Sequence, residues 1–456
     1  MSEHDESSGF LPPWFTSEPI DTVLVAFPDV YGRLIGKRFT HSHFMRSVLK
    51  SGTHMCNYLL TVDIDMKPLE GFRLASWERG YGDFHAVLDL RTVRRMPWCE
   101  GSAIVLADLH HEDGSGDVAE SPRAVLRHQL NRLAGRGLHA MMGSELEFYL
   151  FHNTYSEANQ QKFQGLAPSS DYLIDYHLLQ PARDEDVLRR LRNELGEAGI
   201  QVEGSKGEWG KGQHEVNLLY SAALEMADAH ALYKHAAKEI AAQQDRAITF
   251  MAKWAADQAG SSFHLHTSLW SEKEKRNLFW NDEAQEASEM FRHFLGGLMK
   301  YARELTYFFA PTVNAYKRFQ SASWAPTRMV WSLDNRTTAL RVIGEGNGFR
   351  VENRSPGADA NPYLAFAATL AAGLAGMDEK LDCGPAYSGN AYQDESLERL
   401  PLSLEQAAEL LDQSEFARSA LGDEVVDFYV HTARLEAQDF AANVTDWERK
   451  RYFERI

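Results

Sequence analysis

The chain has 456 residues, a length that suggests two or three domains. Its residues are 44% hydrophobic and 25% charged, which is typical of a globular protein. It contains 47 Lys and Arg residues against 65 Asp and Glu residues, and the net charge of −18 argues against nucleic acid or an anionic membrane as a partner. The three cysteines are scattered and form no CxxC pair, so we expect a cytoplasmic protein without a disulfide framework or a thiolate zinc site.

The N-terminal part of the chain predicts a short tail and a small domain. Residues 1–15 begin with a polar, acidic stretch that has no signal-peptide pattern, so we expect a disordered tail there. Apolar runs at 21–27 and 103–107 are typical of strands. The turn residues Gly114-Ser-Gly-Asp mark the end of a domain that spans 16–115.

Residues 121–456 predict a larger domain in which helices alternate with strands. Ser121 suits a helix N-cap, and Pro122 suits the first helical position. The most apolar stretch, 364–377, is shorter than the roughly 18–20 residues of a membrane span and predicts a buried helix. Apolar spacing predicts further helices at 184–196, 222–244, 289–309, 404–411 and 428–440. The fold class is therefore mixed α+β.

One strand-like segment, residues 143–151 (GSELEFYLF), carries two acidic side chains on the same face. Because side chains alternate along a strand, Glu145 and Glu147 point one way while Leu146 and Phe148 point the other. Adjacent carboxylates repel each other unless a cation lies between them. The segment therefore predicts either a metal site or a solvated acidic face.

Two more segments offer possible metal ligands. Glycines between Glu208 and Glu215 predict a tight loop that brings these carboxylates together, although a surface loop is the simpler interpretation of this segment alone. Alternation in residues 260–269 places three polar side chains on one strand face, either as ligands or as structural groups: His264, His266 and Ser268.

Arginines are dense between residues 314 and 354: Arg318, Arg328, Arg336, Arg341, Arg350 and Arg354. Guanidinium groups bind carboxylates and phosphates, but a salt-bridge network would also explain them. Mostly oxygen ligands favour Mg²⁺ or Mn²⁺ over Zn²⁺, so carboxylates, imidazoles and arginines together indicate a metal-dependent phosphoryl-transfer or ligase site. The Walker A motif is absent from the sequence, which excludes a P-loop enzyme.

Seven motifs occur in the same order in one known family: GSELEFYLF, GKGQHEVN, GSSFHLHTSL, NAYKRF, NRTTALR, RVENR and ANPYLAF. From about residue 20 to its C-terminus the chain resembles the glutamine synthetases. The resemblance implies a small N-terminal β-grasp domain and a large catalytic α/β domain. It also implies a homo-oligomer, a dodecamer of two hexameric rings, whose active sites are shared between neighbouring subunits.

The resemblance assigns roles residue by residue. Ligands of one divalent ion are matched by Glu147, Glu208 and Glu215, and ligands of a second ion, beside the nucleotide phosphates, by Glu145, His264 and Glu352. Positions that face the nucleotide are Glu203, His266, Ser268, Arg336, Arg341, Arg350 and Asn347, although a lysine is usual at the last of these. Glutamate would be bound by Arg318, Arg354 and the backbone of Gly260, and Arg336 would also steady the phosphoryl group.

The implied reaction has two steps. ATP phosphorylates the γ-carboxylate of L-glutamate, and a nitrogen nucleophile then displaces phosphate from the γ-glutamyl phosphate to form an amide. Two Mg²⁺ or Mn²⁺ ions and several arginines suit this chemistry because they offset the charge of the transferred phosphoryl group.

One departure from the family bears on the nucleophile. Glutamine synthetases carry a glutamate six residues after the arginine of the YKR motif, where it helps to hold ammonium, and here that residue is Trp324. An indole can instead pack against the organic part of a larger amine. We therefore expect a ligase that joins glutamate to an amine larger than ammonia. A true glutamine synthetase and a non-catalytic ring-forming relative are the alternatives.

Other departures concern substrate contacts. Ala259 stands where the family has an asparagine, and Lys206-Gly207 replaces a histidine pair before Glu208. In the family, an aspartate from the neighbouring subunit also helps to bind ammonium. Asp63 and Asp65 are the candidates here, and an ordinary surface loop is an equal alternative.

Overall fold

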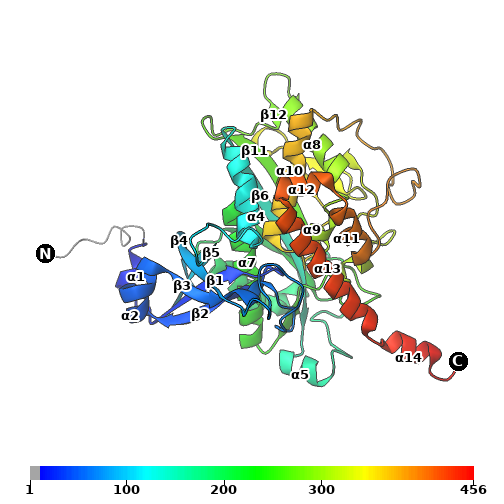
Figure 1. Cartoon of the computed structure of the whole chain (residues 1–456). Coiled ribbons are helices and arrows are strands. Elements are labelled where there is room, and N and C mark those ends of the chain that lie inside the picture. Colours follow the sequence, from blue (N-terminus) through cyan, green and yellow to red (C-terminus); the bar gives the residue numbers. More distant parts are fainter. Residues whose placement is uncertain (1–10) are drawn as a thin grey trace.

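The computed structural model describes residues 11–456, which form an α+β structure built on two main sheets (Figure 1). The first sheet has five strands in the order β2-β1-β5-β4-β3, with β1 antiparallel to β2 and parallel to β5. Its strands are β1 (Thr22–Pro28), β2 (Leu34–Thr40), β3 (Thr53–Cys56), β4 (Asp83–Arg95) and β5 (Ser102–His111). The strands predicted at 21–27 and 103–107 are confirmed, and both are almost wholly buried.

The prediction of a disordered tail over residues 1–15 is wrong for its last residues. Residues 1–10 lie outside the described part of the chain, but helix α1 (Trp14–Ser17) already belongs to the fold. Phe15 anchors this helix, because its ring is buried and its centroid lies 5.7 Å from that of Phe44. Short helices connect the strands that follow: α2 (His41–His43), η2 (Phe44–Val48), α3 (Leu49–Ser51) and η3 (Asn57–Leu60).

The second sheet has nine strands, and its main path runs β14-β15-β16-β11-β6-β8-β7. The long strand β6 (Leu138–Phe151) also pairs with β9 (Ser221–Ala222) and β10 (Ala247–Thr249). The other members are β7 (Val202–Gly207), β8 (Gln213–Leu218), β11 (Phe263–Ser271), β14 (Trp331–Leu333), β15 (Leu340–Ile343) and β16 (Arg350–Asn353). A separate two-stranded sheet consists of β12 (Trp280–Asn281) and β13 (Glu286–Ala287).

Helices pack against this sheet and supply much of the core (Figure 1). Helix α10 (Pro362–Glu379) is almost entirely buried, as predicted for its apolar stretch. Apart from the segment at 289–309, the other helices predicted from apolar spacing are found with shifted ends. The helices outside that segment are α4 (Pro122–Ala134), α5 (Tyr155–Gln160), η4 (Pro181–Asp184), α6 (Glu185–Glu197), α7 (Ala223–Gln243), η5 (Ala315–Arg318), η6 (Gly346–Gly348), α11 (Leu404–Asp412), α12 (Glu415–Leu421), α13 (Asp423–Ala442) and α14 (Asp446–Tyr452). Within residues 11–456 no helix has the length and apolar character needed to cross a membrane.

The single long helix predicted at 289–309 is wrong. The chain instead forms α8 (Glu289–Tyr301) and the short α9 (Thr306–Phe309), with a turn between them. In this turn the Thr306 hydroxyl contacts the carbonyl oxygens of Ala302 and Arg303 at 3.3 and 2.8 Å. Such side-chain bonds to the preceding turn compete with regular helix geometry, a tertiary detail that apolar spacing does not reveal.

A buried ion cluster connects the first sheet to the helices around the second. Arg123 of α4 donates to Asp89 of β4 and to Asp108 of β5, and binds both carboxylate oxygens of Asp228 in α7 at 3.0 and 2.9 Å. The first sheet ends at His111, before α4 begins. The division into a β-grasp domain at 16–115 and a catalytic domain at 121–456 stays a prediction.

Candidate active site

The register of the second sheet places acidic and basic side chains in rows on one face. Glu215 of β8 lies directly opposite Glu147 of β6 on one side and Lys206 of β7 on the other. Directly opposite residues on antiparallel strands have neighbouring side chains. The chain turns between β7 and β8 just after Glu208. As predicted from the glycines in this loop, Glu208 and Glu215 therefore face the same cavity.

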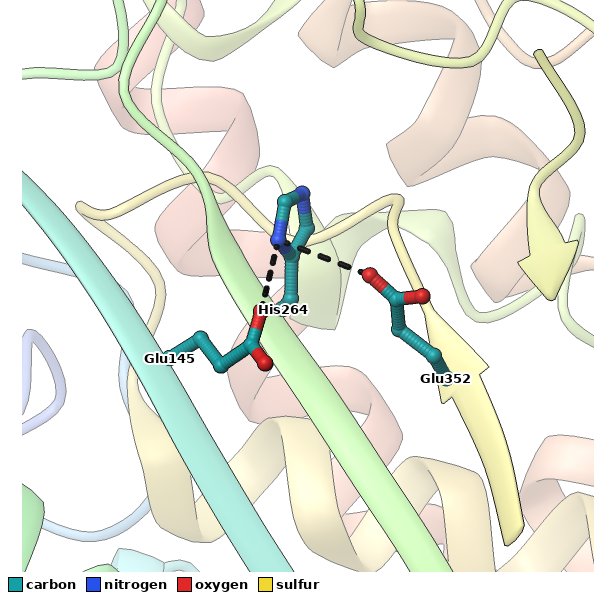
Figure 2. Close-up of side chains that lie close together, drawn as sticks. All are labelled: Glu145, His264 and Glu352. Atoms are coloured by element: carbon teal, nitrogen blue, oxygen red, sulfur yellow. Dashed lines mark hydrogen bonds and ion pairs between the residues drawn. The ribbon is translucent and has the colours of Figure 1, made fainter. Parts of the chain in front are cut away.

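A second row crosses the neighbouring strands. Glu145 lies opposite His264 of β11, and Glu352 of β16 lies opposite both His266 and Arg341. Figure 2 shows Nδ1 of His264 directed at the carboxylates of Glu145 and Glu352, at 3.3 and 3.6 Å. The alternation predicted for 143–151 and 260–269 is thereby confirmed, because Leu146, Phe148 and Leu265 are buried on the opposite face.

These rows line a cavity of about 390 Å³ that contains most of the predicted site. Its walls include Glu145, Glu147, Glu208, Glu215, His264 and Glu352, together with Gly260, Trp324, Arg336, Arg341 and Arg354. Two groups offer ligand atoms that all lie within 4.8 Å of one another: Glu145, His264 and Glu352, and Glu147, Glu215 and His264. Carboxylate oxygens with one imidazole nitrogen are the donor set that Mg²⁺ and Mn²⁺ accept.

The electrostatics of the first row favour a bound cation. Burial and the nearby Glu208 raise the pKa of both Glu147 and Glu215 above the ordinary value, because two buried carboxylates resist being charged side by side. Glu147 is nonetheless fixed in place, since its Oε2 accepts hydrogen bonds from the Ser262 amide at 2.8 Å and from Gln213 Nε2 at 3.0 Å. A divalent ion would relieve the repulsion without moving these side chains.

The second row is held charged by the protein itself. Burial opposes ionisation of Glu352, but Arg354, His264 and His266 together outweigh it and lower the pKa of this carboxyl to about 2. Arg354 Nη1 donates to Glu352 Oε1 at 2.6 Å, and Arg341 Nη1 donates to Glu352 Oε2 at 2.9 Å. His266 also approaches Glu145, with Nε2 3.0 Å from Oε1. Glu352 is therefore a carboxylate whose position is fixed from both sides.

Glu208 does not join the close ligand group that contains its expected partners, Glu147 and Glu215. It lines the cavity, but it belongs to neither of the two close ligand groups found among the described residues. Its carboxylate instead accepts a hydrogen bond from the ammonium of Lys206, which also lies 3.6 Å from Glu215. The sequence marked Lys206 only as a departure from the family; its ionic role depends on the β7–β8 register.

A smaller adjoining cavity of about 240 Å³ contains five of the seven residues expected to face the nucleotide: Glu203, His266, Ser268, Asn347 and Arg350. The other two, Arg336 and Arg341, line the first cavity. The smaller cavity shares Glu145 and Asn217 with the first cavity. Arg350 Nε donates to His266 Nδ1 at 3.1 Å, which leaves Nε2 of this histidine to carry the proton. The two cavities meet at the ligand group that contains Glu145.

Arg318 is not on the wall of the cavity. Its guanidinium is buried and donates to the carbonyl oxygens of Ser355 and Arg354 and to the Ser262 hydroxyl, while Nε has no partner among the described residues. Burial lowers the pKa of Arg318 to about 10. A Cβ on Gly260 would lie 2.4 Å from Arg318 Cγ, so only glycine allows these two segments to approach so closely.

Trp324 lines the cavity beside a second indole that sequence reasoning missed. The ring centroids of Trp324 and Trp209 lie 5.6 Å apart in an edge-to-face arrangement, and both side chains are nearly half exposed, at 46% and 47%. Trp324 has a φ of +65°, a backbone conformation that bulky residues rarely adopt. Arg354 Nη2 contacts its carbonyl oxygen at 3.4 Å, which links the indole to the arginine that binds Glu352.

The structure does not bring Asp63 and Asp65 to this cavity. Asp63 accepts a hydrogen bond from the Lys67 amide, and the Asp65 carboxylate lies 3.9 Å from Lys67 Nζ. Both lie in an exposed turn between η3 and β4, and neither lines the cavity. Arg328 also lies outside the cavity, where it donates to the carbonyl oxygen of Leu397.

Comparison with known proteins identifies the family. The model of the glutamine synthetase catalytic domain matches residues 119–452. The chain belongs to the glutamine synthetase family. A γ-glutamylethanolamide synthetase of Streptomyces coelicolor is 49% identical over 96% of this chain and 93% of its own. A glutamate–isopropylamine ligase of a Pseudomonas species is 35% identical over 96% of both chains.

Solved structures give the same result. A complex of GmaS with ADP has a TM-score of 0.85 and 28% identity, covering 99% of this chain and all of that one. GmaS without ligand has a TM-score of 0.84. These likenesses confirm the glutamine-synthetase-like α+β fold. The family model and the two relatives named as ligases of glutamate and an amine confirm the predicted γ-glutamyl-amine ligase branch and the prediction of a carbon–nitrogen ligase.

Proposed function

We propose that the protein uses ATP to join the γ-carboxylate of L-glutamate to a primary amine with a small organic group, such as ethanolamine. The observation that carries this proposal is the indole pair of Trp209 and Trp324 on the wall that also contains the ligand groups. An indole face gains contact with methylene groups but offers no negative charge to ammonium. The Streptomyces relative, named for an ethanolamide product, is consistent with an amine of this size.

The charge of the amine also has a counterpart in the cavity. Asp175 lies on the same wall as the two indoles, and its neighbour Tyr176 adds a further aromatic ring. A carboxylate next to aromatic faces attracts an alkylammonium ion, which must lose a proton before it can attack the acyl phosphate. Asp175 is a candidate to accept that proton, because it is exposed to the cavity and its pKa is raised by burial and by the nearby Glu208.

Glu145, His264 and Glu352 would hold one Mg²⁺ or Mn²⁺ ion. Glu147 and Glu215, with Glu208 on the same cavity wall, would hold a second ion. Bound ions of this kind neutralise phosphate and carboxylate oxygens during phosphoryl transfer. Arg336 and Arg341, on the same wall, would then face the transferred phosphoryl group. The adjoining cavity with Glu203, Ser268 and Asn347 would hold the nucleotide.

Glutamate would lie between the ligand groups and the segment that Arg318 fixes. The buried guanidinium of Arg318 holds the Ser355 and Arg354 carbonyls and would shape the glutamate site from behind the cavity wall. The backbone of Gly260, which packs on Arg318, would contact the amino group. Arg354 would then lie between Glu352 and the reacting end of the substrate.

We also propose a cytoplasmic homo-oligomer, a dodecamer of two hexameric rings, in which Asp63 or Asp65 enters the cavity of a neighbouring subunit. Support comes from their position in an exposed turn, away from the cavity of their own chain. A true glutamine synthetase is the less favoured alternative, because an indole stands where ammonium needs a carboxylate. A non-catalytic ring-forming relative is disfavoured by the close approach of the ligand groups.

The test is phosphate release from ATP with Mg²⁺, L-glutamate and one amine at a time: ammonia, methylamine, ethanolamine, isopropylamine or putrescine. We expect kcat/KM to be highest for ethanolamine or another short alkylamine. Equal or faster turnover with ammonia would support a glutamine synthetase instead, and the absence of turnover with every amine would support a non-catalytic relative.

A further inference from the structure

A separate cavity of about 550 Å³, the α7 cavity, carries positive charge that the proposed reaction does not use. Its wall is formed by α7, by β10 and the residues after it, and by the turn between β1 and β2. None of its lining residues belongs to the two cavities described above. Among the described residues on this wall, three are lysine or arginine and only one, Asp359, carries a carboxylate.

Two lysines on this wall lie one helical turn apart on α7. The Nζ atoms of Lys234 and Lys238 lie 5.4 and 6.0 Å from the centre of the same ring, that of Phe250. Like charges four residues apart on a helix repel each other and destabilise it. Lys234 donates a hydrogen bond to the Ala358 carbonyl oxygen at 2.8 Å, but within residues 11–456 no carboxylate forms an ion pair with either lysine.

The other charges at the α7 cavity are already engaged. Arg33 Nε donates to Asp29 Oδ2 at 2.7 Å, and Arg33 Nη1 donates to the Ile64 carbonyl oxygen at 2.6 Å. Asp359 Oδ2 accepts a hydrogen bond from the Thr312 hydroxyl at 2.6 Å. Asp359 therefore offsets only part of the charge of the two lysines.

The titration of these lysines agrees with a missing anion. Burial and the charge of Lys238 lower the pKa of Lys234 to about 7, and burial and the charge of Arg33 lower the pKa of Lys238. A bound anion would reverse this effect, because an opposite charge nearby favours the ammonium form. Anion binding would therefore relieve the repulsion between the two lysines.

We propose that the α7 cavity binds a small organic phosphate, whose phosphate group lies between the ammonium groups of Lys234 and Lys238. Ammonium groups bind phosphate as point charges, and two of them match its double negative charge. Much of the remaining wall is apolar or aromatic and would contact the organic part: Tyr31, Leu34, Ile64, Ile248, Phe250 and Met251. The site is separate from the catalytic cavity, so its test does not depend on which amine the enzyme uses.

The experiment is isothermal titration calorimetry of the full-length protein with phenyl phosphate, at low salt and neutral pH, with EDTA and without substrates. Lys238→Gln should weaken binding by at least about tenfold, whereas Lys238→Arg keeps the charge and should retain most of the affinity. The Tm of Lys238→Gln without the probe should equal or exceed that of the wild type, because one of two repelling charges is removed. Lys273→Gln is the matched control, since Lys273 lies exposed in the turn after β11.

Two further comparisons identify the ligand class and the cavity. Benzoate carries one negative charge and should bind about tenfold more weakly than phenyl phosphate. Arg336→Gln alters the wall of the catalytic cavity and should leave the affinity for phenyl phosphate unchanged. The proposal is overturned by no binding to the wild type, by equal binding of benzoate, by an equal loss in Lys273→Gln, or by a loss in Arg336→Gln without one in Lys238→Gln.

Discussion

Glu147 and Glu215 lie directly opposite each other on β6 and β8, and both are almost completely buried. Two carboxylates in this arrangement destabilise a protein unless a proton or a cation offsets their repulsion. The sheet register therefore builds a site that costs stability when empty and that would be stabilised by a bound cation, as proposed above. This repulsion would link the fold of the second sheet to the metal sites proposed for phosphoryl transfer.

The stability of the metal-free protein should fall with rising pH. The pKa of Glu147 and of Glu215 is raised above the ordinary 4.5, so these groups bind more protons in the folded than in the unfolded state. Stability then decreases as the pH rises above about 4.5. Thermal unfolding in EDTA should show a lower Tm at pH 8 than at pH 6, and Mn²⁺ should raise the Tm most at pH 8.

Glu147→Gln is the control for this pH effect. It removes one of the two opposed charges but keeps a side chain of the same shape at the Ser262 amide. The slope of Tm against pH in EDTA should become shallower, and the Mn²⁺-induced rise in Tm should shrink. If wild type and Glu147→Gln show the same slope and the same rise, the opposed carboxylates are not the source of either.

Trp324 should determine the preference for an amine over ammonia. Trp324→Glu removes the indole from the cavity wall and restores the carboxylate of a true glutamine synthetase. We expect kcat/KM for ethanolamine to fall by about tenfold or more and the ratio of ammonia to ethanolamine use to rise. Trp324→Phe, which keeps an aromatic face, should retain most of the preference. An unchanged ratio in Trp324→Glu would show that the indole is incidental.

The buried cluster around Arg123 should be important for folding rather than for catalysis. Arg123→Met leaves Asp89, Asp108 and Asp228 without their shared partner, and a broken buried ion pair costs about 3–5 kcal/mol. Urea unfolding should show this loss. Arg127→Met is the comparison, because its more exposed ion pair with Asp108 is worth at most about 1 kcal/mol. Similar losses in both variants would argue against a special role for the cluster.

Gly260→Ala should disturb glutamate binding through Arg318. The added methyl group would lie 2.4 Å from Arg318 Cγ, so the arginine or the loop must shift. We expect a KM for glutamate at least about tenfold higher and little change in the KM for ATP. Gly196→Ala, where a Cβ meets no atom within 4 Å, is the control. Equal KM values for glutamate in both variants would contradict this assignment.

Much of the site could be predicted from sequence because strands have a period of two. Alternation at 143–151 and 260–269 correctly placed Glu145, Glu147 and His264 on one face. Other features depend on pairings between distant segments. The ion pair of Lys206 follows from the β7–β8 register, and the contact of Trp209 with Trp324 joins two loops that no local pattern relates. The buried position of Arg318 depends on the packing of two distant segments, at Ser262 and Ser355, around it.

The most direct test of the central claim is a competition reaction. The enzyme is incubated with ATP, Mg²⁺, L-glutamate and equal concentrations of ammonia and ethanolamine, and the products are identified by mass spectrometry. The indole wall at Trp209 and Trp324 predicts γ-glutamylethanolamide as the dominant product, with one phosphate released per amide formed. Glutamine as the dominant product would contradict the account.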